Sequence, residues 1–411
     1  MDGSIQTCAR NGTAFGCLKE QSLEESWRSK TFQNFRKKVA SGEFPDEQCR
    51  NCYGNGTARS LIAEFNRVLY INSVIVSKHL DNSFVSRLRC LLSRRTGSKA
   101  DEKFFKKYLS EVEHLLNKSN KSKKIDIRIK NALNKLRVIG IAVRDYLKGA
   151  ELPEIVAPYR QVNLISGCNA RCIMCCGRYT GEIHSNQSMD ESYISSAFSG
   201  TEDITDFFMN GSEFLLYPKW RELATALVGA GVKLSISTNG ILLTPKNIGF
   251  LIDNKIVKGI NVSMDGATEE TLESIRVNVK YDRLVKNLKY LFSYATEKQY
   301  DFLLSFSFVL MRRNYKEFPL LVRLINNIRD GFSYPSVNIY CQALETFNIP
   351  GYNDFYRQEH HSTVNRDELV KSFKKTLKAS KDTGIETGAF YSYTLKDFIK
   401  RGCPFPVFVD R

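Results

Sequence analysis

From about residue 154 onward, short apolar runs alternate with longer segments whose apolar residues recur at helical spacing. Strands separated by helices are typical of βαβ units, in which neighbouring strands run parallel. The pattern therefore predicts an α/β fold built on one parallel sheet. The strands that it predicts cover residues 162–165, 206–209, 234–237, 259–263, 303–310 and 337–340.

The helices expected between these strands carry their own signals. Ser188 and Glu191 have the spacing of a capping box, and Pro245 stands at a first-turn position. A further helix is indicated by the apolar stripe of Leu284, Leu288 and Leu291.

The first 150 residues follow a different pattern. A capping box at Ser22 and Glu25 precedes apolar residues at helical spacing, which predicts one amphipathic helix ending near Gly42. Residues 56–150 contain 21 lysine and arginine residues against 8 aspartate and glutamate residues. We expect several basic helices whose apolar stripes are core faces; the alternative is an electrostatic footprint for RNA, DNA or another polyanion. The stripes comprise Phe104, Leu109, Val112, Leu115 and Leu116, and then Ile129, Leu133, Leu136 and Ile139.

Composition narrows the class of protein. The chain has 411 residues, of which 42% are hydrophobic, so it is long enough for two or three domains with a sizeable core. Its first residues lack the pattern of a secretory signal, and the longest apolar run, at 68–76, is too short to span a bilayer. We therefore expect a cytoplasmic protein without membrane contact. In a reducing compartment cysteines serve metals or catalysis more often than disulfides.

Three of the eleven cysteines form the densest chemical motif. Cys168, Cys172 and Cys175 follow the first predicted strand of the sheet, with three and then two residues between them. Thiols at this spacing can bind three irons of one [4Fe–4S] cluster and leave the fourth iron to chelate a small molecule; ferredoxins use a tighter spacing and four cysteines. A zinc site would need four ligands, and the adjacent Cys176 does not easily reach the same centre as Cys175. A disulfide framework would need an oxidising compartment.

Polar residues also follow the next three predicted strands. In a parallel barrel the loops at the carboxyl ends of the strands converge on one face, where sites are built. We therefore expect these loops to direct polar groups to the same place as the cysteines. The loops contain Asn210-Gly-Ser-Glu213, Thr238-Asn-Gly240 and Met264-Asp-Gly266.

Residues 160–345 resemble the core of a radical S-adenosylmethionine (SAM) enzyme. The resemblance rests on Gly167-Cys-Asn-Ala-Arg-Cys-Ile-Met-Cys175, Gly211-Ser-Glu213, Ser237-Thr-Asn-Gly240 and Ser263-Met-Asp-Gly266. It implies an α/β fold with a partial (β/α)6 TIM-like barrel. The glycine loop is looser than in the family, and Met174 stands where an aromatic residue often precedes the third cysteine.

The resemblance also implies roles for individual residues. Cys168, Cys172 and Cys175 would hold a [4Fe–4S] cluster whose fourth iron chelates SAM. Glu213 would accept a charge-assisted hydrogen bond from the SAM ammonium, and Gly211 would allow close approach of the backbone. Ribose and carboxylate contacts would come from Thr238, Asn239, Ser263 and Asp265, and Arg276 would pair with the SAM carboxylate. Ordinary turn chemistry is the alternative for the strand-end residues.

Both ends of the chain resemble parts of a SPASM domain, the extension that holds auxiliary Fe–S clusters in many radical SAM enzymes. Residues 1–55 are similar to its later part, and residues 401–411 to its start. We expect either a permuted enzyme or a piece of a longer protein with repeating modules. If the two ends meet, a second [4Fe–4S] cluster would be closed by Cys8, Cys49, Cys52 and Cys403.

The sequence thus predicts four parts: a SPASM-like piece at 1–55, a basic helical segment at 56–150, a radical SAM core at 151–345 and a helical extension at 346–411. The expected activity is that of an oxidoreductase that reductively cleaves SAM to a 5′-deoxyadenosyl radical, which abstracts hydrogen from a peptide or from an alcohol or sugar carbon. A reductase such as flavodoxin or ferredoxin would supply the electron. The alternative is a non-catalytic Fe–S electron carrier or an RNA-binding module.

Overall fold

The chain forms two compact units in the computed structural model. One comprises residue 1 together with residues 161–189 and 207–411, and the other comprises residues 2–160 and 190–206. The domain boundaries expected at 55, 150 and 345 remain predictions. The structure describes residues 4–6, 14–41, 43, 99–121, 127–148, 150–156, 159–181, 183, 185, 187–197, 206–209, 212–229, 232–345, 349–389, 395 and 399.

A seven-stranded sheet organises the fold, with its strands in sequence order from β3 to β9. The pairs from β4 to β9 are all parallel, which confirms the predicted parallel sheet. The strands are β3 (Tyr159–Val162), β4 (Asp206–Met209), β5 (Leu234–Thr238), β6 (Val257–Ser263), β7 (Leu303–Leu310), β8 (Ser336–Ala343) and β9 (Glu386–Ala389).

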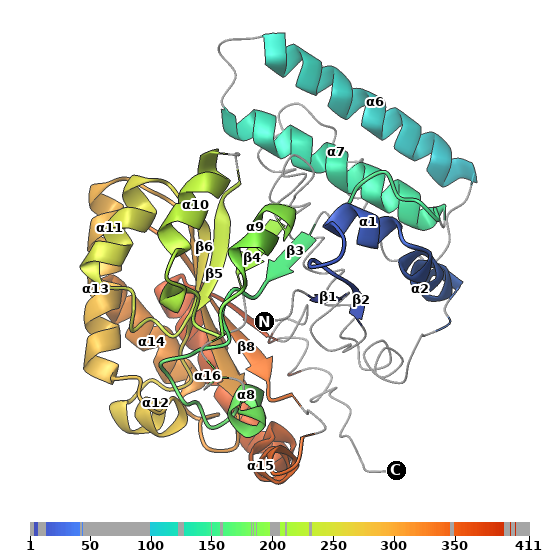
Figure 1. Cartoon of the computed structure of the whole chain (residues 1–411). Helices are drawn as coiled ribbons and strands as arrows, with labels where there is room; N and C mark the ends of the chain where they lie inside the picture. Colours follow the sequence, from blue (N-terminus) through green and yellow to red (C-terminus); the bar gives the residue numbers. More distant parts are fainter. Residues whose placement is uncertain are drawn as a thin grey trace. The chain divides into compact units, whose positions relative to one another are not determined.

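Helices connect the parallel strands, and Figure 1 shows α11, α13 and α14 along one side of the sheet. Helix α11 begins with Pro245 at its first turn, as predicted, and Leu284, Leu288 and Leu291 of α13 are buried. The helices of this unit are α8 (Cys176–Thr180), α10 (Trp220–Gly229), α11 (Pro245–Asp253), α12 (Glu269–Ile275), α13 (Tyr281–Glu297), α14 (Phe318–Arg329), α15 (Tyr352–Glu359) and α16 (Arg366–Thr383), with the 3-10 turns η3 (Phe214–Leu216) and η4 (His361–Thr363).

The two faces of the sheet differ in chemistry. On β7, Phe306 and Phe308 are fully buried, and the Phe308 ring stacks on Phe318 of α14 with 5.1 Å between centroids. Phe318 in turn meets Phe373 of α16 at 6.4 Å. This face is therefore the apolar core under the helices. Successive side chains of a strand point to opposite faces, so Ser305 and Ser307, which alternate with these phenylalanines, lie on the other face.

The first predicted strand was misplaced. Strand β3 ends at Val162, whereas Ile165 makes only an isolated antiparallel bridge to Ser188. The chain is turned away from the sheet because the Ser166 N–H donates to the Gln187 carbonyl at 2.9 Å. The capping box predicted from Ser188 was wrong as well.

Helix α9 (Glu191–Ala197) is instead capped by Asp190, whose Oδ1 accepts from the Ser192 N–H at 2.9 Å. Strand β9 was not predicted at all, because its sequence Glu-Thr-Gly-Ala contains no apolar run. It forms by backbone pairing with β8, to which it runs parallel.

The second unit contains β1 (Ser4–Gln6), β2 (Ala14–Cys17), α1 (Leu23–Arg28), α2 (Lys30–Ser41), α6 (Lys99–Lys121) and α7 (Ile127–Leu147). The Ser22 capping box is present, but the single helix predicted after it is broken at Ser29, whose extended backbone ends α1 and whose Oγ accepts from the Phe32 N–H. Within the described residues, no helix has the length and apolarity needed to cross a membrane.

The α6 and α7 helices pack on each other through the predicted stripes. The Tyr108 hydroxyl donates to the Leu136 carbonyl at 2.9 Å. Leu109, Val112, Leu133, Leu136 and Ile139 are buried, as predicted; the side chains of Phe104 and Ile129 lie outside the described residues. A cavity of about 650 Å³ beside the helices is lined by Lys103, Lys106, Leu109, Ser110, Glu113, Arg144 and Lys148. Arg144 forms ion pairs with Asp145 and Glu154, at 2.6 and 2.7 Å, which offset the charge of this arginine.

Candidate active site

The cysteine loop is fixed by backbone hydrogen bonds to the last residue of α12 and to the segment that follows it. The Arg171 N–H donates to the Val277 carbonyl at 2.8 Å, and the Ile173 N–H donates to the Ile275 carbonyl at 2.9 Å. Cys175 ends the loop as the N-cap of α8, with an extended backbone. The loop is thus tied to a residue stretch about a hundred positions away in the sequence.

Nitrogen donors point at two of the three sulfurs. Cys168 Sγ lies 3.4 Å from the Ala170 nitrogen and 3.9 Å from Asn239 Nδ2. Arg276 Nη1 lies 3.5 Å from Cys172 Sγ. Such donors stabilise a thiolate, which is the form of cysteine that binds metal.

Burial works in the opposite direction on these thiols. It raises the pKa of Cys168 to about 11, and it also raises the pKa values of Cys172 and Cys175. Buried thiols with N–H donors directed at them need a cationic partner to stay ionised, and a metal cluster is such a partner. In the described part of the chain, no three His, Cys, Asp or Glu side chains gather as ligands of a single metal ion. The thiolates of an Fe–S cluster bind different irons, so their sulfurs need not meet at one point.

Arg276 is held in place by Asp265. Its Nη2 lies 2.6 Å from Asp265 Oδ2, and both side chains are almost completely buried. The other carboxylate oxygen of Asp265 accepts from the Val309 N–H at 2.6 Å. Burial raises the pKa of Asp265, and the guanidinium opposes this shift.

One donor of this guanidinium has no partner in the described part of the chain. Arg276 Nε is buried and has no hydrogen-bond acceptor among the residues that the structure describes. An unsatisfied buried donor is costly, so the site fits a bound group that offers an acceptor beside Cys172. A SAM carboxylate or a cluster sulfide has that chemistry. The residues present therefore fit the cofactors that the sequence predicts.

Glu213 is buried next to the start of the cysteine loop. Its backbone N–H donates to the Gly167 carbonyl at 3.2 Å, and its carboxylate accepts from the Thr238 hydroxyl and the Asn239 N–H, both at 2.8 Å. The residue is 1% exposed. Burial raises its pKa to about 7, against the lowering effect of the two hydrogen bonds.

Asn239 links Glu213 to the cysteine loop. Its Nδ2 donates to Asn169 Oδ1 at 2.6 Å, and its Oδ1 accepts from the Ile241 N–H at 3.0 Å. The next residue, Gly240, has φ +80, and a Cβ there would lie 2.3 Å from Leu284 Cδ1. The turn after β5 therefore requires glycine.

Most predicted site residues in the described part of the chain lie in two bonded groups that meet the cysteine loop. One group joins Glu213, Thr238 and Asn239 to Cys168, and the other joins Asp265 and Arg276 to Cys172. Ser263 ends β6 beside Ser307 of β7. Gly211, Cys8, Cys49, Cys52 and Cys403 lie outside the described residues.

Sequence reasoning missed three asparagines that support these two groups. Asn169 contacts Asn239, and Asn314 Nδ2 donates to the Asp265 carbonyl at 2.9 Å. Asn287 of α13 donates to the Gly240 carbonyl at 2.9 Å. Asn169 was detectable from its place inside the cysteine motif; the other two carry no local signal.

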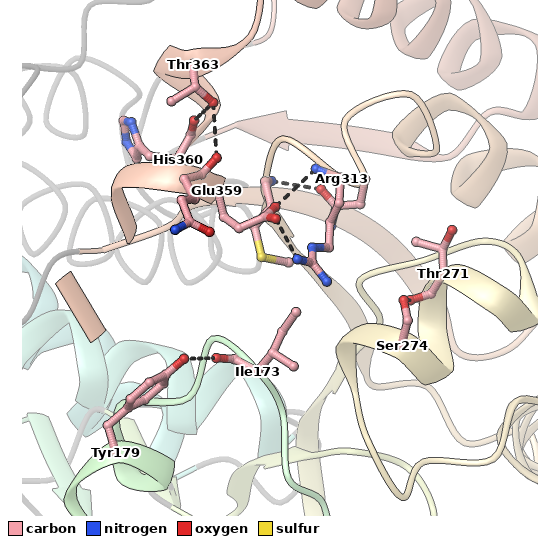
Figure 2. Close-up of polar contacts among 11 residues, drawn as sticks. Ile173, Tyr179, Thr271, Ser274, Arg313, Glu359, His360 and Thr363 are labelled. Atoms are coloured by element: carbon pink, nitrogen blue, oxygen red, sulfur yellow. Dashed lines mark hydrogen bonds and ion pairs between the residues drawn. The ribbon is translucent and has the colours of Figure 1, made fainter. Parts of the chain in front are cut away.

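Helix α15 and the turn η4 border the cysteine loop. Figure 2 shows the Tyr179 hydroxyl donating to the Ile173 carbonyl, at 3.1 Å, and Arg313 facing Glu359, at 2.6 Å. The end of β7 is joined to η4 because Met311 forms an antiparallel bridge with His360. Ile173, Met174, Phe355 and Tyr356 pack around a small core of Ile275, Met311 and Leu344. An apolar wall thus stands beside the cysteines.

Comparisons with known families agree with this site. Residues 162–325 match the sequence model of the radical SAM superfamily, and residues 1–53 match that of the SPASM iron–sulfur cluster-binding domain. These families imply [4Fe–4S] clusters and SAM.

Curated relatives match over part of their length. The AdoMet-dependent heme synthase of Methanosarcina barkeri is 28% identical over 158 residues, which are 38% of this chain and 43% of the relative. Mycofactocin maturase MftC of Mycobacterium tuberculosis is 29% identical over 132 residues, or 31% and 32% of the two chains. The chain thus matches less than half of the length of these relatives. Among solved structures, Streptococcus suis SuiB bound to precursor peptide SuiA is similar with a TM-score of 0.47 and 14% identity, over 78% of this chain and 69% of that one.

Proposed function

The chain belongs to the radical SAM superfamily and carries a SPASM-type iron–sulfur domain, and from that premise we propose that it cleaves SAM reductively and abstracts hydrogen from a substrate. The observation that supports this most directly is the three-cysteine loop, in which Cys168 Sγ receives N–H donors from Ala170 and Asn239 and Cys172 Sγ receives one from Arg276. When bound, a [4Fe–4S] cluster supplies the electron that splits SAM into methionine and a 5′-deoxyadenosyl radical.

The chain's own residues would bind and orient the reactants. Cys168, Cys172 and Cys175 would hold the cluster, and the unused Nε–H of Arg276 would bind an acceptor of SAM. Glu213, already bonded to Thr238 and Asn239, would fix the loop after β5 and offer a carboxylate to the SAM ammonium. Gly211, Ser263 and Asp265 would complete the SAM contacts. The apolar residues Ile173, Met174 and Phe355 would limit access of water to the site.

The test is formation of 5′-deoxyadenosine from SAM and dithionite under anaerobic conditions, without added substrate. The reconstituted chain should form it slowly, and Cys172→Ala should reduce it to background. Cys341→Ala changes a buried thiol in β8 and serves as the matched control, which should retain most of the product. Equal yields from the wild type and Cys172→Ala would refute SAM cleavage and leave an electron carrier as the better hypothesis.

A second [4Fe–4S] cluster is a separate proposal. It would be held by Cys8, Cys49, Cys52 and Cys403, in line with the SPASM match at residues 1–53. Two clusters correspond to about eight irons per chain and one to about four. Cys49→Ala should lower the iron content from about eight to about four and leave 5′-deoxyadenosine formation without substrate in place. A wild-type chain with only about four irons would rule the second cluster out.

The partners follow from the reaction. The electron would come from a reductase such as flavodoxin or ferredoxin, and reducing conditions of the cytoplasm would keep the thiols available for iron. The substrate would be a peptide or a small molecule with an alcohol or sugar carbon.

A further inference from the structure

The face of the sheet opposite the helices is lined by neutral hydrogen-bonding side chains. Residues paired in register on neighbouring parallel strands share a face, and one such row joins Ser237, Asn261, Ser305 and Asn338 across β5 to β8. The row two residues further along contains Ser263, Ser307 and Tyr340. The interior of a TIM-type barrel is normally filled by branched apolar residues, so this polar composition is unusual.

Side-chain contacts confirm that these residues face one another. Asn261 Nδ2 donates to Ser237 Oγ at 3.0 Å and to Ser307 Oγ at 3.3 Å. The intervening residues, such as Phe306 and Phe308, pack on the opposite face under α14 and α16. The members of both rows are either half-buried or, like Ser307, 4% exposed. The polar face is therefore a continuous floor over four strands.

Two acceptors on this floor lack a donor among the residues that the structure describes. The side-chain carbonyl oxygens of Asn261 and Asn338 are buried and accept no hydrogen bond from the described residues. A buried carbonyl without a donor costs free energy until water or a ligand supplies one. The two asparagines are in the same row, separated by Ser305 of β7. A ligand on the floor would therefore have to donate at two or more points.

The position of this row relates it to the proposed reaction. Asn261 precedes Ser263, and Asn338 precedes Tyr340, by two residues, which is about 6 to 7 Å along a strand. The cysteine loop and the Asp265–Arg276 pair lie beyond the carboxyl ends of β3 and β6. The floor thus lies on the strands themselves, and the proposed SAM site lies just beyond their carboxyl ends. A substrate bound on the floor could therefore present one of its carbons to the radical.

We infer that this floor binds a neutral, polyhydroxylated group of the substrate, through Asn261, Ser305 and Asn338. The inference rests on the proposed radical SAM function and specifies its substrate class. Hydroxyl groups donate to the two open carbonyls and accept from the serine hydroxyls, so one kind of group satisfies the entire row.

Other substrate groups fit this row less well. In register, the first row continues from Asn338 to the exposed Glu386 of β9, whose carboxylate would repel an anionic group. The residues that β5 to β8 contribute to these rows carry no charge, so a charged group resting on them would lose its hydration without gaining a counter-charge. An apolar group would leave the two carbonyls without donors. A peptide main chain is typically recognised along the edge of a sheet, whereas these rows cross its central strands.

The test is ligand-observed saturation-transfer NMR on the full chain, both free of iron and reconstituted. The probes are D-glucose, myo-inositol, sodium glutamate and N-acetyl-alanyl-alanine amide. We expect saturation transfer from the wild-type chain to glucose or inositol. Asn338→Leu and Ser305→Ala should each bind that probe at least tenfold more weakly. The control Asn327→Leu alters an exposed asparagine of α14 and should bind the probe as the wild type does. Ser305→Ala keeps the proposal testable if the leucine variant does not fold.

Three outcomes would overturn the inference: no binding of either hydroxylated probe, binding unaffected by both floor variants, or preferential binding of the peptide amide or of glutamate. Binding to the iron-free chain is independent of SAM cleavage. A chain that binds glucose but forms no 5′-deoxyadenosine would retain this inference and lose the proposed function. A chain that forms 5′-deoxyadenosine but preferentially binds the peptide amide would retain the proposed function and lose this inference.

Discussion

The guanidinium of Arg276 is bonded at the same time to the Asp265 carboxylate, at 2.6 Å, and to Cys172 Sγ, at 3.5 Å. Both charged side chains are buried, so the pair is shielded from water. Removing one partner of a buried pair leaves the other charge uncompensated, which typically costs about 3–5 kcal/mol. Arg276→Met should lower the free energy of unfolding in urea by this amount. Arg323→Met, in an exposed ion pair on α14, should cost less than about 1 kcal/mol; equal losses would contradict the assignment.

The same contact should tune the cluster. A cation and a hydrogen bond at a ligand sulfur stabilise the reduced, more negative form and raise the reduction potential. In the reconstituted chain, Arg276→Met should therefore lower the potential of the SAM cluster by about 60 mV, a tenfold change for a one-electron couple. A redox titration followed by electron paramagnetic resonance measures this shift, and Arg276→Lys should recover part of it. An unchanged potential would mean that Arg276 only supports the fold.

Glu213 should make the stability of the iron-free chain depend on pH. Burial raises its pKa in the folded chain from 4.5 to about 7, so between these values the folded state holds a proton that the unfolded state has lost. The free energy of unfolding should therefore fall as the pH rises from 4.5 to 7, by on the order of 3 kcal/mol. In Glu213→Gln, the free energy of unfolding should no longer show this fall with pH, which urea unfolding at several pH values would measure. The exposed Glu222→Gln is the control, and a slope shared by all three chains would show that Glu213 does not contribute.

Gly266 should tolerate no side chain. A Cβ there would lie 2.6 Å from the Leu272 nitrogen and 3.0 Å from its Cα, so the backbone of α12 would have to move. We expect Gly266→Ala to cost about 1–3 kcal/mol in thermal or urea unfolding and to weaken SAM binding by shifting Asp265. Gly229→Ala, with nothing within 4 Å of the new Cβ at the end of α10, should be neutral or slightly stabilising. A larger loss of stability in Gly229→Ala than in Gly266→Ala would show that the turn after β6 can accommodate a Cβ.

The ion pair of Arg313 and Glu359 joins the end of β7 to helix α15 (Figure 2). Their side chains are 39% and 12% exposed, so solvent weakens the pair, and a double-mutant cycle with Arg313→Ala and Glu359→Ala should give a coupling of about 0.5–1 kcal/mol. The Arg312 N–H also donates to the Glu359 carbonyl, at 2.7 Å, which neither variant removes. A coupling near zero would mean that the ion pair adds nothing to the backbone and apolar contacts of α15.

The sequence by itself determined the parts of the fold that depend on local pattern. Alternation of apolar runs and helices specified the parallel sheet, and Pro245 and the leucine stripe of α13 marked helices that the structure contains. The cysteine spacing indicated the cluster chemistry because ligand spacing is a local property. Local signals failed at Ser188, because Asp190 caps helix α9 instead. They also failed at β9, because this strand contains no apolar run.

Only the tertiary structure decided how distant residues meet. Arg276 and Cys172 are separated by 104 positions, and their contact depends on the backbone pairing of the cysteine loop with residues 275–277. The polar floor is present in the sequence only as isolated serines and asparagines. Its continuity arises from strand register, because parallel pairing places Ser237, Asn261, Ser305 and Asn338 side by side on one face. Register is set by the packing of the opposite, apolar face against the helices, which no single segment encodes.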